Sequence, residues 1–221
     1  QLALALLADH LGDGPEALRL YPAFMREVVA ALDPALAGRN EIRVAVREVG
    51  GGWEVEVRDN GPGIVKAQAP KIFGKLLYGS KFHRLRMSRG QQGIGISAVV
   101  LYGQLTTGKH AKIISKIQAD HPAVITELAI DTNKNRGEVL HQEITHWEKP
   151  SGTRVEVNLI ADYKRGKRFV YDYLQSTSIV NPHARIVLKD AEGTEHVFER
   201  TAELLPKKSE EIKPHPYGVE L

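Results

Sequence analysis

The sequence has no cysteine and no long hydrophobic run. The first absence excludes disulfides, thiolate metal sites and cysteine nucleophiles, and is typical of intracellular chains. The opening apolar stretch QLALALLADHL is interrupted by Asp9 and His10, far short of the roughly 20 residues that a spanning helix needs. No basic region precedes it, as a signal peptide would require. We therefore expect a cytoplasmic chain with no membrane attachment, folded around a hydrophobic core.

A strong excess of one charge is also missing. Thirty Lys and Arg face 27 Asp and Glu, so the net charge is only +3, and any DNA contact would have to be local. The nine histidines form no H-E-x-x-H motif, which makes a histidine-based metal hydrolase remote. With 221 residues and 42% hydrophobic content, the chain can close the core of one large domain or two small ones.

The hydrophobic pattern predicts a two-layer α+β arrangement with a mostly antiparallel sheet. A helical period over 14–36 is followed by the alternating runs EIRVAVREV and WEVEVRD, joined by three glycines as in a β-hairpin. Residues 60–93 are glycine-rich and basic, and we expect a long, partly mobile segment there rather than a packed element. The remaining predicted elements are a buried helix over 93–101, strands near 111–118, 123–131, 137–147 and 153–160, a helix near 165–178, and a strand at 184–189.

We expect the side chains on one face of this hairpin, from both strands, to be buried in the core. Alternation places Val44, Val46, Val55 and Val57 on that side.

The strongest local motif is DNGPGI, which begins at Asp59 where the second hairpin strand ends. Glycines here allow a sharp turn, and an acid in this position can accept a hydrogen bond from an amino group such as that of adenine. A plain turn with a solvated aspartate explains the motif equally well, so it needs support from elsewhere in the chain.

A second motif, SRGQQGIGIS over 88–97, places three glycines at a helix start. Exposed backbone amides beside the positive end of a helix suit a phosphate chain, although such a run is often an ordinary loop. The motif lacks the GK[ST] of a P-loop and the preceding strand of a Rossmann fingerprint. Between the two motifs, the basic stretch 75–89 has the character of a lid over phosphates; a solvated loop and a DNA-contacting patch remain alternatives.

Several stretches together resemble one family. KIFGKLLYGSKFHRLRMSRGQQGIGISAVVLYGQLTTGK is similar to the ATP lid and phosphate loop of the B subunits of type IIB DNA topoisomerases, the topoisomerase VI kind. DNGPGI resembles their adenine-side box, SGTRVEVNL their later Gly-Thr box, and YDYLQSTSIVNPHARIVL with PKKSEEIKPHPYGVEL the close of the same domain. The resemblance is strong from Glu41 to Leu221 and weaker before it.

This resemblance implies the Bergerat, or GHKL, ATP-binding fold shared by gyrase, heat-shock chaperones, histidine kinases and MutL. It implies a domain over 1–205, with 1–40 as an atypical N-terminal helical part, and a linker over 206–221 toward a following domain. The implied function is ATP-gated dimerisation with ATP and Mg²⁺, coupled to double-stranded DNA passage with an A subunit in the nucleoid.

The resemblance also assigns roles to residues. Asp59 would bind the adenine amino group with Thr153 beside it through water, and Glu27 would activate water for hydrolysis. Gly61 and Gly63 would shape the adenine pocket. The phosphates would be wrapped by a further set with Lys81 near them: Gly90, Gln91, Gln92, Gly93, Ile94 and Gly95.

The first helix departs from the family pattern. The family places a metal-holding asparagine four residues after the glutamate, but here that position is Ala31, which has no oxygen ligand. A degenerate homologue, an altered N-terminal segment, or a ligand supplied by Asp33 or Asn40 would each explain this, although Pro34 restricts the backbone of Asp33. The alternative function is therefore a nucleotide- or partner-binding module without turnover. A MutL-like repair protein or a histidine kinase is disfavoured by the long lid match.

Overall fold

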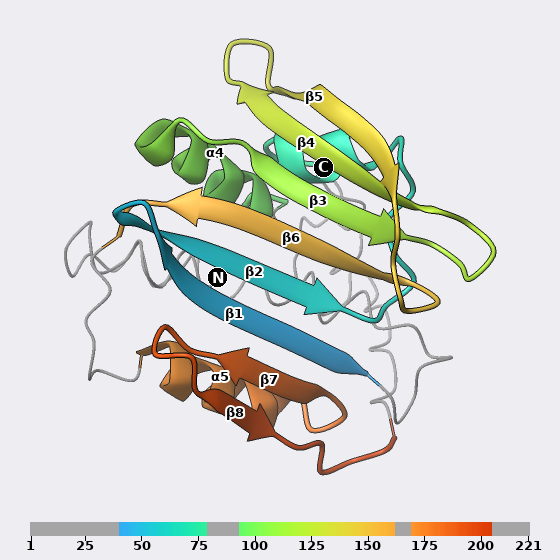
Figure 1. Cartoon of the computed structure of the whole chain (residues 1–221), viewed down its shortest axis with the longest axis vertical. Helices are drawn as coiled ribbons and strands as arrows, with labels where there is room; N and C mark the ends of the chain where they lie inside the picture. Colours follow the sequence, from blue (N-terminus) through green and yellow to red (C-terminus); the bar gives the residue numbers. More distant parts are fainter. Residues whose placement is uncertain (1–39, 79–92, 162–168, 205–221) are drawn as a thin grey trace, which may run out of the picture.

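An eight-stranded sheet covered on one side by helices forms the framework (Figure 1). The computed structural model describes residues 40–78, 93–161 and 169–204. The strands are β1 (Glu41–Val49), β2 (Gly52–Asp59), β3 (Ala111–Lys116), β4 (Ala123–Asp131), β5 (Arg136–Thr145), β6 (Gly152–Leu159), β7 (Arg185–Lys189) and β8 (Glu195–Phe198). The helices are α3 (Ala69–Gly74), α4 (Gly95–Thr107) and α5 (Phe169–Val180).

The strand order is β5-β4-β3-β6-β2-β1-β7-β8, and β1 with β7 is the one parallel pair among the strands of the described residues. The β1–β2 hairpin closes through Gly50 and Gly51, with φ angles of 61° and 79°. Two consecutive positive φ values are what a tight two-residue hairpin turn requires. The mostly antiparallel α+β sheet expected from the sequence is therefore confirmed.

The core lies between the sheet and the helices, which sit behind the sheet in Figure 1. Val44, Val46, Val55 and Val57 are all buried in it, which confirms the side predicted from the alternation. Helix α4 approaches β6 closely at Gly103, where a Cβ atom would lie 2.5 Å from the carbonyl oxygen of Asn158. No helix within the described ranges is long and apolar enough to cross a membrane.

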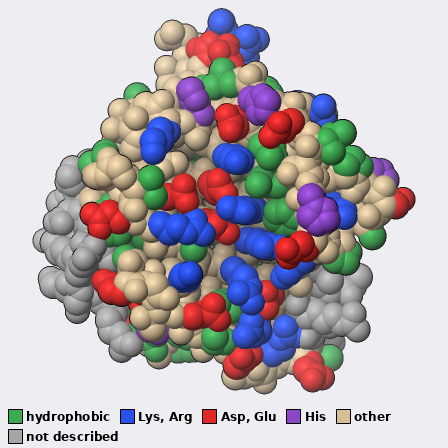
Figure 2. Space-filling model, viewed as in Figure 1, with side chains coloured by type: hydrophobic (Ala, Val, Ile, Leu, Met, Phe, Trp, Pro, Cys, Tyr) green, Lys and Arg blue, Asp and Glu red, His purple; other side chains and the backbone are tan. Residues whose placement is uncertain are grey.

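The opposite face of the sheet is polar, and Figure 2 shows it covered with side chains of both charges. Arg47 bridges Glu54 and Glu56 on the neighbouring strand, at 2.7 and 2.6 Å. A second, small cluster of buried apolar residues consists of Ile114, Ala123, Ile125 and Trp147, and Arg58 lies over the ring of Trp147. Several of these charges pair across neighbouring strands, and Figure 2 shows Lys and Arg side chains running as a band through the middle of this face with Asp and Glu beside them.

Two elements differ from the sequence-based expectation. The segment after Asp59 was expected to stay unpacked up to residue 93, but within its described part α3 buries Phe73 in the core. Strand β8 was not expected, because the four-residue run EHVF is too short to show a clear alternation. The ends of β3 and β5, at Lys116 and Thr145, fall two residues before those predicted.

Helix α3 is fastened to the turn between β4 and β5. A Cβ atom on Gly74 would lie 2.2 Å from the Cα of Gly137, so the two backbones touch. The side chain of Asn135 accepts a hydrogen bond from the amide of Leu76 at 2.9 Å and donates one to its carbonyl oxygen at 3.2 Å. The chain is thereby anchored immediately before the segment 79–92.

We expect Gly137→Ala to destabilise the protein by about 1–3 kcal/mol, because the new Cβ would lie 2.4 Å from the carbonyl oxygen of Pro70 and force α3 away. Urea unfolding monitored by circular dichroism measures this loss. Gly108→Asn is the control: nothing lies within 4 Å of that position, and asparagine tolerates its φ of 68°. Equal stability of Gly137→Ala and the wild type would contradict the close contact.

Candidate functional site

The last residue of β2, Asp59, lies where the ends of three strands meet. Its Oδ1 accepts hydrogen bonds from the amide of Gly61 at 2.8 Å and from the amide of Thr153, at the start of β6, at 3.2 Å. The described residues donate no hydrogen bond to Oδ2. One carboxylate oxygen is thus fixed by backbone amides of the described residues.

Burial raises the pKa of Asp59 to about 6, although the two amide hydrogen bonds and the positive charge of Lys149 act to lower it. At neutral pH the carboxylate is mostly ionised. It is then a strong acceptor in surroundings that exclude much of the water, which makes it suited to recognising an amino group.

Glycines allow the backbones around Asp59 to come close. Gly63 has a φ of 73°, and a Cβ there would lie 2.2 Å from the carbonyl oxygen of Lys116 at the end of β3. Gly152 has a φ of 143°, and its Cβ would lie 2.4 Å from the carbonyl oxygen of Asp59. Ser115 joins the same strand ends, since its Oγ accepts from the amide of Ile64 at 2.6 Å and donates to the carbonyl oxygen of Gly152 at 3.4 Å.

A helix N-terminus supplies the second candidate feature. Helix α4 begins at Gly95, and Ile94 before it provides no side-chain cap for the first amides. Gly93 has a φ of 63°, and a Cβ on it would lie 2.3 Å from the carbonyl oxygen of Tyr78. Tyr78 and Gly93 are therefore in contact.

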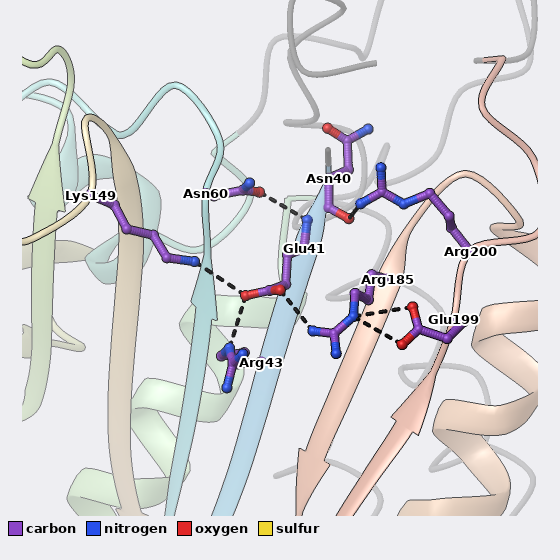
Figure 3. Close-up of polar contacts among 8 residues, drawn as sticks. All are labelled: Asn40, Glu41, Arg43, Asn60, Lys149, Arg185, Glu199 and Arg200. Carbon is purple, nitrogen blue, oxygen red and sulfur yellow. Dashed lines mark hydrogen bonds and ion pairs between the residues drawn. The ribbon is translucent and has the colours of Figure 1, made fainter. Parts of the chain in front are cut away.

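A group of charged side chains at the start of β1 was not found from the sequence (Figure 3). The carboxylate of Glu41 contacts Arg43 at 2.8 Å, Lys149 at 3.2 Å and Arg185 at 2.8 Å. Burial works to raise the pKa of Glu41, but the hydrogen bonds and charges of Arg43 and Lys149 outweigh it and lower the pKa to about 2. The amide of Glu41 also donates to Oδ1 of Asn60 at 2.9 Å, next to Asp59.

The structure brings together four of the residues singled out from the sequence, Asp59, Gly61, Gly63 and Thr153, around one carboxylate. It places Gly93, Ile94 and Gly95 at the start of α4. A further set lies outside the described residues: Glu27, Ala31, Lys81, Gly90, Gln91 and Gln92. Sequence reasoning missed Ser115 and Gly152, and Gly152 could have been found because it lies in the Gly-Thr box.

Comparison with known proteins identifies the family. The family model described as "Histidine kinase-, DNA gyrase B-, and HSP90-like ATPase" matches residues 17–163, about two thirds of the chain. The chain belongs to this ATPase family. Membership agrees with the α+β sheet and with an acidic residue followed by glycines at the end of β2.

The similar curated proteins are B subunits of type 2 DNA topoisomerase 6. The one from Methanosarcina mazei is 52% identical over 183 residues, which cover 82% of this chain and 30% of that protein. The proteins of the same name from Archaeoglobus fulgidus and Natronomonas pharaonis are each 46% identical, over 90% and 96% of this chain and 34% and 26% of their own lengths. The chain thus spans about a third or less of these relatives.

A solved structure, the ATPase domain of Aquifex aeolicus MutL complexed with ADP, aligns with a TM-score of 0.46 and 16% identity, over 81% of this chain and 63% of that chain. This distant likeness adds nothing to the family assignment.

The raised pKa of Asp59 has a consequence for stability. An acid whose pKa is higher in the folded state costs stability while ionised, and this cost shrinks as the pH falls from about 6 toward the ordinary value of 3.8. We expect Asp59→Asn, which keeps the oxygen that accepts the two amide bonds, to raise the melting temperature by about 2–6 °C at pH 7.5 and by much less at pH 4.5.

Differential scanning calorimetry of both proteins across this pH range tests the prediction, and histidine titration cancels in the difference. Asp172→Asn, on the exposed side of α5, makes the same chemical change outside the site and should give a flat difference. A variant of Asp59 that is less stable than the wild type at pH 7.5 would refute the electrostatic account.

Proposed function

We propose that this chain is the ATP-binding domain of a topoisomerase VI B subunit and that Asp59 recognises the adenine amino group. The observation that carries the proposal is the difference in contacts between the two oxygens of the Asp59 carboxylate. Backbone amides hold Oδ1, and the described residues leave Oδ2 to a ligand. An exocyclic amino group is the donor on adenine that fits a carboxylate oxygen.

The glycines support this role, because they let neighbouring backbone pack closely around the turn that carries the carboxylate. A side chain at Gly63 or Gly152 would collide with neighbouring backbone, so the turn keeps its shape only with glycine. In the proposed complex Gly61 and Gly63 line the adenine. Thr153, whose amide already contacts the same carboxylate, contributes its hydroxyl through a water molecule.

The phosphates are proposed to lie over the start of α4. Uncapped amides at Gly95 and the following residues, together with the positive end of the helix dipole, favour an anion there. Gly90, Gln91, Gln92, Gly93 and Ile94 complete the loop, and Lys81 approaches the phosphates from the basic segment. The contact between Gly93 and Tyr78 gives this segment two adjacent attachment points, as a lid requires.

The residues that the structure describes offer few ligands to magnesium. The described residues contain no group of three or more His, Asp or Glu that could hold a metal ion, and Ala31 stands where the family has an asparagine. Mg²⁺ is therefore proposed to arrive with the nucleotide, since it is often held largely by phosphates and water. Glu27 is the proposed base for water attack.

The wider functions are proposed from the B-subunit relatives. Residues 1–205 form the ATP-binding domain, and 206–221 connect it to a following domain. ATP binding drives self-association, coupled to passage of double-stranded DNA with an A subunit, inside the cell and on the nucleoid. The second candidate, a nucleotide- or partner-binding module without turnover, is favoured by Ala31 alone.

The adenine assignment is tested with Asp59→Asn. This change places an NH₂ group where the adenine amino group needs an acceptor, so affinity for a non-hydrolysable ATP analogue should fall about 10- to 100-fold. Isothermal titration calorimetry at pH 7.5 measures the loss, with Asp172→Asn as the control that should bind like the wild type. Unchanged affinity in the Asp59 variant would remove the basis of the proposal.

The missing metal ligand leads to a separate expectation. The chain should bind Mg²⁺-ATP more weakly than a family member with the usual first helix, and hydrolyse it barely or not at all, because Ala31 offers no oxygen to the cation. Ala31→Asn should raise the magnesium dependence of nucleotide affinity, and Glu27→Ala should abolish residual turnover with binding nearly intact. Robust, Glu27-dependent hydrolysis by the unmodified chain would mean that a different residue holds the metal.

A further inference from the structure

The turn that follows β2 crosses the start of β6 and reaches β3, because β6 lies between β2 and β3 in the sheet (Figure 1). Where the turn begins, a Cβ atom on Gly152 of β6 would lie 2.4 Å from the carbonyl oxygen of Asp59. Where it reaches β3, a Cβ atom on Gly63 would lie 2.2 Å from the carbonyl oxygen of Lys116. The turn next to the proposed adenine acceptor is therefore packed against two other strands.

Ser115, near the end of β3, contacts both the turn and the start of β6. Its Oγ accepts a hydrogen bond from the amide of Ile64 in the turn at 2.6 Å and donates one to the carbonyl oxygen of Gly152 at 3.4 Å. The first bond is short and the second is long, so the hydroxyl holds the turn more tightly than it holds β6. Ser115 is also the ladder partner of Thr153, the residue after Gly152.

A second side chain makes the same kind of bridge from the other strand. Oδ1 of Asp59 accepts hydrogen bonds from the amide of Gly61 in the turn and from the amide of Thr153 in β6. The carboxylate at the end of β2 and the hydroxyl of Ser115 on β3 thus join the turn to the start of β6 at two points. A turn held at one point can rotate about it, whereas a turn held at two points keeps its orientation.

The hydroxyl of Ser115 has no ready replacement. Only 8% of the residue is exposed, so water has little access to the space that a lost Oγ would leave. Its removal would take the acceptor from the amide of Ile64 and a donor from the carbonyl oxygen of Gly152. The turn would then be held to β6 through the Asp59 carboxylate alone among the side-chain contacts described here.

We propose that Ser115 is a positioning residue of the nucleotide site, whose hydroxyl fixes the turn after β2 against the start of β6. Asp59 and Thr153 are thereby kept at the separation and orientation that adenine needs. This inference rests on the proposed function. Ser115 acts through Asp59 and needs no contact with the nucleotide, because its hydroxyl already bonds to backbone on both sides.

The experiment measures binding of a non-hydrolysable ATP analogue at pH 7.5 by isothermal titration calorimetry, well below the melting temperature of every variant. We expect Ser115→Ala to lose about five- to tenfold in affinity, since one well-formed hydrogen bond in the site is removed. Ser115→Thr keeps the hydroxyl and should bind like the wild type. The matched control is Thr177→Val, which removes a buried hydroxyl that donates to the carbonyl oxygen of Tyr173 at 2.8 Å, in a helix that packs on β7 and β8.

A double variant separates positioning from general support of the fold. If Ser115 acts through Asp59, adding Ser115→Ala to Asp59→Asn should cost no more than about a further twofold, because the acceptor that Ser115 positions is already lost. If Ser115 only supports the fold, the two losses multiply. Asp59→Asn keeps the oxygen that accepts the two amide bonds, so the bridge from β2 remains in both backgrounds.

Amide hydrogen exchange followed by NMR, without nucleotide, tests the bridge itself. Exchange at Ile64 should accelerate in Ser115→Ala and stay slow in Ser115→Thr and Thr177→Val. The role of Ser115 is overturned if Ser115→Ala binds like the wild type, if the losses multiply in the double variant, or if Ser115→Thr keeps exchange slow at Ile64 yet binds as weakly as Ser115→Ala. Failure of the wild type to bind the analogue, or unchanged binding by Asp59→Asn, refutes the proposed function instead.

Discussion

The rest of the proposed site depends on one carboxylate kept from water at the end of a strand. Burying Asp59 is unfavourable for its charge, and the fold offsets this cost with two backbone amides and a nearby ammonium group. The amide of Thr153 follows Gly152, whose backbone approaches the carbonyl oxygen of Asp59 as only glycine permits, and Gly63 packs in the same way against Lys116. The strand ends, the glycines and the charged group around Glu41 are therefore parts of one electrostatic arrangement.

Much of the sheet could be predicted from the sequence, because a strand can be recognised from the pattern of its own residues. The alternation of Val44, Val46, Val55 and Val57 is local and survives in the structure. Helix α3 could not be foreseen in the same way, since its packing depends on the contact of Gly74 with Gly137, which are 63 residues apart. Six residues give too short a period to distinguish a helix from a loop.

The candidate site also contains residues that the sequence predicts and residues that it does not. Short motifs, recognisable by their order along the chain, predict four residues of the site: Asp59, Gly61, Gly63 and Thr153. Glu41 and Lys149 are ordinary charged residues in a chain that is 26% charged, so nothing in the sequence distinguishes them. Only the pairing of β1 with β2 and β7 makes Glu41 a meeting point, and pairing is a property of the folded sheet.

Two carboxylates only a few residues from the same strand ends respond to acid in opposite ways. Burial dominates at Asp59 and raises its pKa to about 6, whereas cations prevail at Glu41 and lower its pKa to about 2. As the pH falls through 6, protonation of Asp59 relieves an unfavourable buried charge, while Glu41 keeps its ion pairs until far lower pH. The charge of the proposed nucleotide acceptor is thus lost on mild acidification while the ion pairs of Glu41 persist. Ionised Asp59 costs stability at neutral pH because its charge is buried, and the positive charge of Lys149 acts against that cost. The proposed recognition of an amino group would use this charged form.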